Sequence, residues 1–168
     1  MAGEMIRKPN TAQKFLHRFF MLKPVTDFFA PRIHHLDNAV LKLTRGKFTA
    51  VEILGWNVIQ LTTIGAKSHQ RRTVPLVGIF DGQKIALIAS SFGRHHNPGW
   101  FYNLKANPEC KVLFKGKSLK YVAREIDGSE GERYFQMAVD QYAGYKRYRE
   151  RASQSHRHIP IMLLEPKN

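Results

Sequence analysis

Two glycine-containing turns, each set between runs of apolar and β-branched residues, most constrain how this 168-residue chain can fold. The first turn is Asp81-Gly82 and the second is Lys115-Gly116-Lys117. Because glycine tolerates the positive φ that a tight hairpin needs, each turn predicts two antiparallel strands joined directly. The chain is therefore expected to be rich in antiparallel β structure.

Patterns of the same kind predict six strands beyond about residue 51. They are expected at Val58–Thr63, Arg72–Phe80, Lys84–Ala89, Glu109–Phe114, Leu119–Ile126 and Pro160–Leu164. The proline in the last of them is typical of an edge strand. Strands interrupted by helices predict a mostly antiparallel α+β fold built as a small barrel.

Helix-start signals place helices between the strands. Asn97-Pro98 predicts an N-cap followed by proline at the first helical position, which gives a short helix at Pro98–Lys105. Ser129–Glu132 fits a capping box and predicts a longer helix at Glu130–Tyr142. A further turn or two of helix is expected to follow it.

The chain is interpreted as one domain of residues 1–168, with a helical N-terminal segment at 1–47 and the barrel at 48–168. Thr11–Leu22 is basic, aromatic and amphipathic, so packing on the core of its own domain or on a partner subunit is favoured, and contact with an anionic membrane surface is the alternative. Without a signal-peptide core or an apolar run near ~18 residues, a cytoplasmic protein is expected. The single cysteine, Cys110, excludes an intrachain disulfide.

Positive charge is concentrated in the first three quarters of the chain. Residues 1–123 carry 19 basic and 6 acidic groups, a net charge of +13, whereas residues 124–168 carry 8 and 7, a net charge of +1. Such a field suits nucleic acid, an anionic membrane or a multiply charged small ligand. No helix-turn-helix, zinc-finger or RRM signature accompanies it, so nucleic acid is not the expected partner.

The basic charge is densest in GAKSHQRRTVP, which begins at Gly65 and follows the first predicted strand. Gly65 lets the backbone turn tightly, and successive loop N–H groups can form an anion-binding concavity. Lys67 adds a point charge, Ser68 a hydroxyl and Arg72 a planar fork suited to phosphate or carboxylate. The spacing is neither that of a P-loop nor that of a dinucleotide loop. An anion site is favoured over a solvated hairpin end.

Two further stretches carry groups suited to a planar ligand. ASSFGRHHNPGWFYN, residues 89–103, places Ser90-Ser91 after a strand and the aromatic run Trp100-Phe101-Tyr102 on a helix; Trp100 as an ordinary core residue is the alternative. YAGYKRY, residues 142–148, spaces Tyr142, Tyr145 and Tyr148 three apart, so on one helix they would lie along one side and line a pocket.

Metal-dependent and hydrolytic chemistry find little support. Adjacent histidines on a strand point to opposite faces, and no HExxH or Cys/His cluster occurs, so no metal is expected. Acidic residues are scarce outside the C-terminal helices, and no nucleophile–histidine–carboxylate set can be assembled. That scarcity suits chemistry performed by a cofactor, which the protein binds and orients.

With these stretches side by side, the sequence resembles the deazaflavin-dependent nitroreductase family, whose mycobacterial members reduce quinones and activate nitroimidazoles. The resemblance runs from Leu61 to Pro166 and is carried by LTTIGAKSHQRRTVPL, ASSFGRHHNPGWFYNLKANP, YAGYKRY and IPIMLLEP in the family's order. It implies a six-stranded split β-barrel of the flavin-binding kind that includes pyridoxamine-phosphate oxidase, with N-terminal helices. It also implies coenzyme F420, a deazaflavin with a phosphate and an oligoglutamate tail.

The resemblance carries residue roles over by position. It assigns the phosphate-bearing side chain of the coenzyme and its neighbouring parts to Lys67, Ser68, Arg72, Thr73, Val74, Pro75, Leu76 and Val77. It assigns the deazaflavin ring to Ile88, Ala89, Ser90, Ser91, Gly99, Trp100, Phe101, Tyr102 and Asn103. It assigns the substrate pocket to Ser90, Tyr142, Tyr145 and Tyr148.

The implied reaction is hydride transfer from reduced F420 to a quinone, nitroaromatic or activated alkene, with Tyr145 the favoured proton donor. Three departures from the family pattern stand out: Ala66 replaces an arginine of many relatives, His69 a glycine, and Ser91 a lysine of the mycobacterial nitroreductase. FMN is the alternative cofactor. A non-catalytic basic module that binds a ligand or nucleic acid is the alternative function, and a homodimer is left open.

Overall fold

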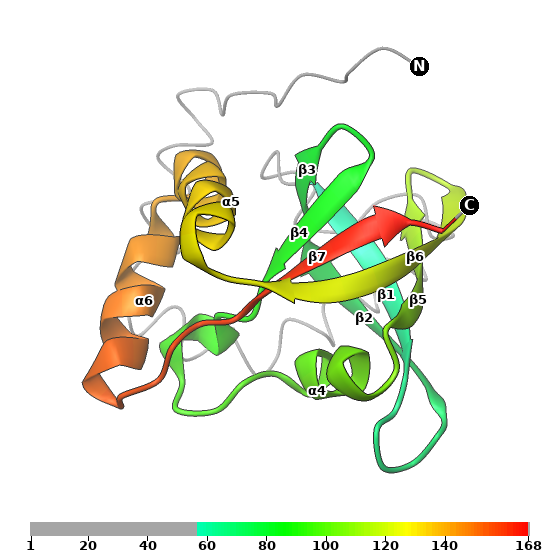
Figure 1. The fold of residues 1–168 in the computed structure, drawn as a ribbon, viewed down its shortest axis with the longest axis horizontal. Coiled ribbons are helices and arrows are strands. Elements are labelled where there is room, and N and C mark those ends of the chain that lie inside the picture. Colours follow the sequence, from blue (N-terminus) through cyan, green and yellow to red (C-terminus); the bar gives the residue numbers. More distant parts are fainter. Residues whose placement is uncertain (1–56, 168) are drawn as a thin grey trace, which may run out of the picture.

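The computed structural model describes residues 57–167 of the chain (Figure 1). The strands are β1 Val58–Ile64, β2 Arg71–Val77, β3 Ile79–Asp81, β4 Lys84–Ile88, β5 Glu109–Phe114, β6 Lys117–Ile126 and β7 Ile161–Pro166. The helices are the 3-10 turn η2 Ser91–Gly93, α4 Gly99–Ala106, α5 Gly128–Gln141 and α6 Gly144–Gln154. One antiparallel sheet in the order β2-β1-β5-β6-β7-β4-β3 holds all seven strands.

The predicted antiparallel α+β class is confirmed, but the sheet has seven strands rather than the six expected. The predicted strand Arg72–Phe80 is divided at Gly78 into β2, which pairs with β1, and β3, which pairs with β4. A side chain at Gly78 would lie 3.0 Å from Ile85 and 3.3 Å from Ile59, so only glycine allows the chain to bend this closely over the sheet. The alternation of apolar and polar residues from 72 to 80 gives no sign that the chain changes its pairing partner from β1 to β4.

The bend at Gly78 curls the sheet into a half-barrel, because β2 and β3 are its two edge strands and follow each other in the chain. The final strand is not at an edge as predicted: β7 pairs with both β4 and β6. Pro160 lies just before β7, where no ladder hydrogen bond is required of it.

Helix starts differ from the predicted caps. α4 begins at Gly99 with Pro98 as its N-cap residue, and the Asn97 side chain accepts a hydrogen bond from Arg157 instead of capping the helix. α5 begins at Gly128 with Asp127 as N-cap, so the capping box predicted at Ser129–Glu132 does not form. In both cases an arginine from a distant part of the sequence binds the predicted capping side chain. Arg157 binds Asn97, and Arg149 of α6 pairs with Glu132.

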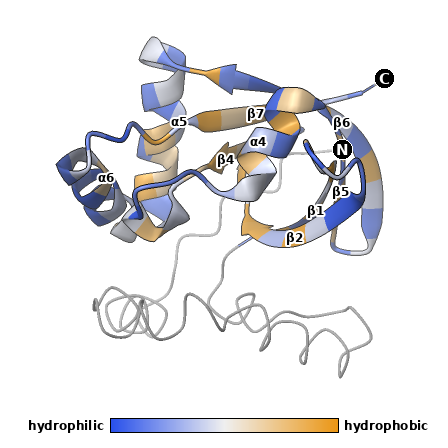
Figure 2. Ribbon diagram, turned by 90° about the horizontal axis from the view of Figure 1, so that it is seen from below, coloured by the Kyte–Doolittle hydropathy of each residue, from blue (hydrophilic) through white to orange (hydrophobic). Residues whose placement is uncertain are grey.

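Two apolar cores lie on opposite faces of the sheet. The first fills the barrel and includes Leu61, Leu164 and the α4 residues Phe101 and Leu104, because α4 lies across one end of the barrel (Figure 1). The second lies between the sheet and the pair α5 and α6. Its main members are Ile79, Ile88, Ile126, Tyr134, Phe135, Ala138, Leu163 and the three tyrosines at 142, 145 and 148. α6 is hydrophilic over most of its length in Figure 2 and buries only one narrow face.

Cys110 lies inside the barrel, where burial raises the pKa of its thiol to about 12. The predicted N-terminal helical segment at 1–47, its membrane contact through Thr11–Leu22 and the start of the barrel at 48 lie outside the described residues. Within residues 57–167, every helix is too short or too polar to cross a bilayer.

Candidate functional site

The turn between β1 and β2 presents the cation-rich stretch at one end of the barrel. Lys67, His69, Arg71 and Arg72 are all exposed there, and no carboxylate among residues 57–167 pairs with any of them. In the same part of the chain, the backbone N–H groups of Lys67 and Ser68 have no hydrogen-bond acceptor. Free donors and unpaired cations on one turn are the elements of an anion-binding site.

The turn is closed by backbone hydrogen bonds around Gly65. Gly65 N–H donates to Gln70 O at 2.8 Å, and His69 N–H donates to Gly65 O at 2.9 Å. A Cβ at Gly65 would lie 2.5 Å from Ser68 Oγ, a contact that rotation of the exposed serine relieves, and 3.3 Å from Gln70 O, so a larger residue fits there only tightly. His69 replaces a glycine of the family pattern, which suggests a different turn. His69 nevertheless takes the left-handed conformation that glycine favours, with φ 54°. That conformation costs a non-glycine residue roughly 1–2 kcal/mol.

Asn103 joins this turn to α4. Its Oδ1 accepts a hydrogen bond from Ala66 N–H at 3.0 Å, and its Nδ2 donates to Thr63 Oγ1 at 3.0 Å. Thr63 is 1% exposed, so its hydroxyl depends on this partner. Asn103 therefore fixes α4 against the cation-rich turn, and both belong to the predicted coenzyme site.

The end of β4 leads into a backbone of unusual conformation. Ser91, Phe92 and Gly93 have φ angles of 47°, 57° and 77°, so three successive residues are left-handed. Ser90 O accepts a hydrogen bond from Gly93 N–H at 2.9 Å, which closes the turn. A side chain at Gly93 would meet Arg151 Cβ at 2.7 Å, because the turn lies directly on α6. The predicted serines thus sit on a constrained turn at the barrel end that α4 covers.

Arg157 completes this turn and was not among the residues singled out from the sequence. Its Nη1 donates to Ala89 O at 3.1 Å and to Asn97 Oδ1, and its Nη2 donates to Ser90 O at 2.5 Å. It precedes β7 by three residues and lies 67 positions from Ser90 in the sequence. No local pattern marks it, because every partner is distant along the chain.

The aromatic run on α4 divides between core and surface. Trp100 and Phe101 are 8% and 6% exposed and belong to the barrel core, which is the alternative considered for Trp100. Tyr102 is 50% exposed and meets Phe101 edge-on, with ring centroids 5.4 Å apart. Among the three, Tyr102 is the one with a face open to a ligand.

The three tyrosines do come together, but not along one helix. Tyr142 is the C-cap residue of α5, whereas Tyr145 and Tyr148 lie on α6. Their ring centroids are 5.9 to 6.1 Å apart, and Phe92 meets Tyr148 edge-on at 5.8 Å. Each tyrosine is less than a tenth exposed. Burial raises the pKa of all three phenols, so they stay protonated at neutral pH.

The β2 residues predicted to contact the coenzyme extend away from the turn. Arg72 and Val77 are separated by five residues of strand, about 16 Å. Val74 and Leu76 pack against the barrel core, and Val77 packs against the core under α5 and α6. A ligand that touches Lys67 and all of Arg72–Val77 would have to lie along β2, an edge strand of the described sheet.

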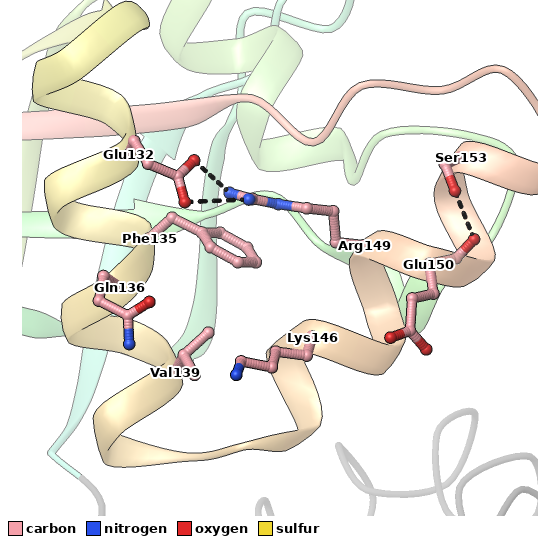
Figure 3. Close-up of a pocket in the computed structure, with 8 residues that line it drawn as sticks. All are labelled: Glu132, Phe135, Gln136, Val139, Lys146, Arg149, Glu150 and Ser153. Carbon is pink, nitrogen blue, oxygen red and sulfur yellow. Dashed lines mark hydrogen bonds and ion pairs between the residues drawn. The ribbon is translucent and has the colours of Figure 1, made fainter.

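A cleft of about 360 Å³ lies elsewhere, between α5 and α6 (Figure 3). Arg149 spans it: its guanidinium pairs with Glu132 at 3.0 Å and lies 3.1 Å from the centre of the Phe135 ring. No residue predicted for the coenzyme or the acceptor lines this cleft, and two of its four charged residues, Glu132 and Arg149, pair with each other. Within residues 57–167, no group of three or more His, Cys, Asp or Glu side chains is arranged to hold a metal ion.

Comparison with known proteins identifies the family of the chain. The family model described as F420H(2)-dependent quinone reductase matches residues 37–166. The F420H(2)-dependent quinone reductase Rv1261c of Mycobacterium tuberculosis (strain H37Rv) is 33% identical over 106 residues, which are 62% of this chain and 70% of that protein. A second protein of that strain, the putative F420H(2)-dependent quinone reductase Rv3178, is 29% identical over 101 residues, 60% of this chain and 82% of that protein.

Solved structures give the same grouping. The F420-H2 dependent reductase FDR-A is 36% identical, with a TM-score of 0.59 over 65% of this chain and 94% of that one. A domain-swapped dimer is 31% identical, with a TM-score of 0.62 over 83% of this chain and 98% of that one. A heme binding protein of Mycobacterium smegmatis, 16% identical with a TM-score of 0.52 over 67% of this chain and 47% of that one, shares the fold alone. The resemblance drawn from the motifs is thus confirmed: the chain belongs to the F420H(2)-dependent quinone reductase family and is an oxidoreductase whose family cofactor is coenzyme F420.

Proposed function

We propose that this chain binds reduced coenzyme F420 at the barrel end covered by α4 and passes its hydride to a quinone. The observation that carries the proposal is the turn at residues 65–72, where exposed cations without carboxylate partners in the described residues adjoin free backbone N–H groups. Turns of this chemistry bind phosphate and carboxylate groups. Coenzyme F420 carries both.

The residues of this chain fit the coenzyme by charge. Lys67 and Arg72 would hold the phosphate, with N–H groups of the turn as further donors, and the flanking His69 and Arg71 would face the polyanionic tail. Ala66 and Ser91 supply no charge where relatives carry cations. Arg71 and Arg94, both exposed, lie five and three positions from Ala66 and Ser91 in the sequence and would supply charge in their place. The fit favours F420 over FMN because four basic side chains exceed what one phosphate needs.

When bound, the reduced coenzyme supplies the hydride. The chain's own contribution is placement: the segments Ile88–Ser91 and Gly99–Asn103 would confine the ring, and the exposed face of Tyr102 would contact it. Holding the two reactants in contact removes much of the entropic barrier to hydride transfer. Tyr145 as proton donor stays a prediction, and so do the substrate-pocket roles of Ser90, Tyr142 and Tyr148.

A fluorescence titration with oxidised coenzyme F420, run beside one with FMN, tests the proposal. Lys67→Ala and Arg72→Ala are each expected to weaken F420 binding at least about tenfold, as loss of a charge-assisted contact does. Lys111→Ala is the matched control, because it removes an exposed lysine from β5 without touching the turn. Unaltered F420 affinity in both turn variants would place the tail elsewhere. Preference for FMN would overturn the cofactor assignment.

The acceptor is tested by following oxidation of the reduced coenzyme with a simple naphthoquinone, then with a nitroaromatic and an activated alkene. The family name supports the quinone; the other two acceptors stay predictions. Reduced coenzyme that remains unoxidised with every acceptor, despite tight binding, would support a carrier in place of an enzyme.

We also propose a homodimer, because a relative 31% identical over most of the chain forms a domain-swapped dimer. Light scattering of the purified protein measures the assembly directly. The cytoplasmic location and the peripheral membrane contact of Thr11–Leu22 stay proposals, testable by fractionation and by binding to anionic vesicles.

A further inference from the structure

Arg157 is a cation held in the protein by neutral groups. It donates to the carbonyls of Ala89 and Ser90 and to the Asn97 side chain, and no carboxylate among residues 57–167 pairs with it. Its Nε atom is buried and has no partner in the same part of the chain. Burial lowers the pKa of this guanidinium. A charge kept in such surroundings is costly, so its retention needs a reason.

The three partners of Arg157 come from two segments. Ala89 and Ser90 follow β4, and Asn97 precedes α4. The intervening residues include the left-handed run at Ser91–Gly93, a conformation that persists only where the surroundings hold it. A guanidinium suits this position because its planar fork fixes several acceptors in one plane. A lysine ammonium is a single point and fixes fewer directions.

We infer that Arg157 is a positioning residue for the coenzyme: by clamping Ala89 and Ser90 to Asn97, it presets the two segments that flank the proposed ring position. This inference rests on the proposed function. Arg157 contacts the backbone carbonyls of Ala89 and Ser90, whereas the substrate-pocket role predicted for Ser90 would use its side chain, so loss of Arg157 should weaken coenzyme binding and leave acceptor affinity nearly unchanged. Groups held in position by a supporting shell bind with less loss of conformational freedom.

The test uses the full chain, three variants and a fourth, Arg157→Ala, for chemical rescue. Arg157→Met removes the fork and the charge but keeps most of the volume, whereas Arg157→Lys keeps the charge without the fork. Arg124→Met is the matched control. Arg124 also makes a forked contact, to the two carboxylate oxygens of Glu130 at 2.9 and 2.7 Å, but it lies on the outer surface of β6. Each variant is measured by circular dichroism for folding, by fluorescence for the Kd of oxidised F420, and by steady-state kinetics for the quinone KM.

In Arg157→Met we expect the Kd of F420 to rise at least about tenfold. A change of this size corresponds to the loss of one to two charge-assisted hydrogen bonds. We expect a smaller rise, about threefold, in Arg157→Lys, and a change below twofold in Arg124→Met. The quinone KM, at saturating coenzyme, should change less than twofold in all three. Adding millimolar methylguanidinium to an Arg157→Ala variant should recover part of the lost F420 affinity.

The inference fails if the parent binds F420 and the folded Arg157 variants bind it equally well. It also fails if the quinone KM rises as much as the Kd of F420, or if neither Arg157→Met nor Arg157→Lys folds, which would make Arg157 a residue of the fold alone. A parent protein that binds no F420 would overturn the proposed function itself, and the inference with it. The two failures are therefore distinguished by the parent titration.

Discussion

Asn103→Ala is the substitution whose cost can be worked out most directly from the structure. It removes two hydrogen bonds of 3.0 Å, one from Ala66 N–H and one to Thr63 Oγ1. Two net hydrogen bonds contribute about 1–3 kcal/mol, and a hydroxyl left unpaired at 1% exposure costs about 1–3 kcal/mol more. Alanine regains roughly 0.6 kcal/mol of helix propensity in α4. The free energy of unfolding is therefore expected to fall by about 1.5–5 kcal/mol.

A double-mutant cycle isolates the buried hydroxyl. Thr63→Val removes that hydroxyl at nearly constant shape. In the Thr63→Val background, Asn103→Ala therefore no longer leaves the buried hydroxyl of residue 63 without a hydrogen-bond partner. We expect the cost of Asn103→Ala to fall by about 1–2 kcal/mol there, a coupling typical of groups in direct contact. Urea unfolding measures all four proteins, and 2 kcal/mol corresponds to a midpoint shift of about 1 M.

Two results would refute this reasoning. One is a cost of Asn103→Ala below about 0.5 kcal/mol, the level of an ordinary surface substitution. The other is a coupling to Thr63→Val within the ~0.3–0.5 kcal/mol expected of independent sites. Either would mean that α4 is held on the barrel by Phe101 and Leu104 alone, and that the turn at Ala66 does not depend on Asn103.

Two further predictions concern residues away from the cation-rich turn. Gly144→Ala should lower the melting temperature although alanine normally favours a helix, because the new methyl group would overlap the ring of Tyr142; a raised melting temperature would contradict the packing. Hydrogen bonds from Arg133 and Tyr134 lower the pKa of Asp81, so its contribution to stability is present above about pH 4 and is lost as the pH falls through the folded pKa. Asp81→Asn should flatten the dependence of the unfolding free energy on pH below about pH 4; an unchanged slope would show that other carboxylates cause it.

The sequence predicted the strands and hairpins well because the determining interactions are local. Gly82 and Gly116 take the left-handed conformations that their turns demand, with φ of 60° and 76°, and each hairpin forms at its predicted turn. Alternation then sets which side chains enter the barrel. These signals depend on neighbours a few residues away, which is the distance over which a sequence pattern can be read.

The misses have non-local causes. The bend at Gly78 depends on Ile59 and Ile85, and the role of Asn97 depends on Arg157, 60 positions further along. The tyrosines were grouped correctly although the reason was wrong: Tyr142 joins the other two from the end of α5, not from a shared helix face. Arg157 itself could have been found only by asking which partly buried cation lacks an acidic partner, and that question needs coordinates.

The bend at Gly78 has a consequence for how the molecule opens. Residues 71–81 form both edge strands of the described sheet. Detaching this segment would therefore remove both edges of the barrel in one step. Its amides from β2 to β3 should then exchange with solvent as one cooperative unit. An anion bound at Arg72 would stabilise the β2 end of this segment. Because the segment opens as one unit, amide exchange at Phe80, near its β3 end, would also slow. Coenzyme binding at Arg72 would thereby stabilise both edges of the barrel through one continuous segment of the chain.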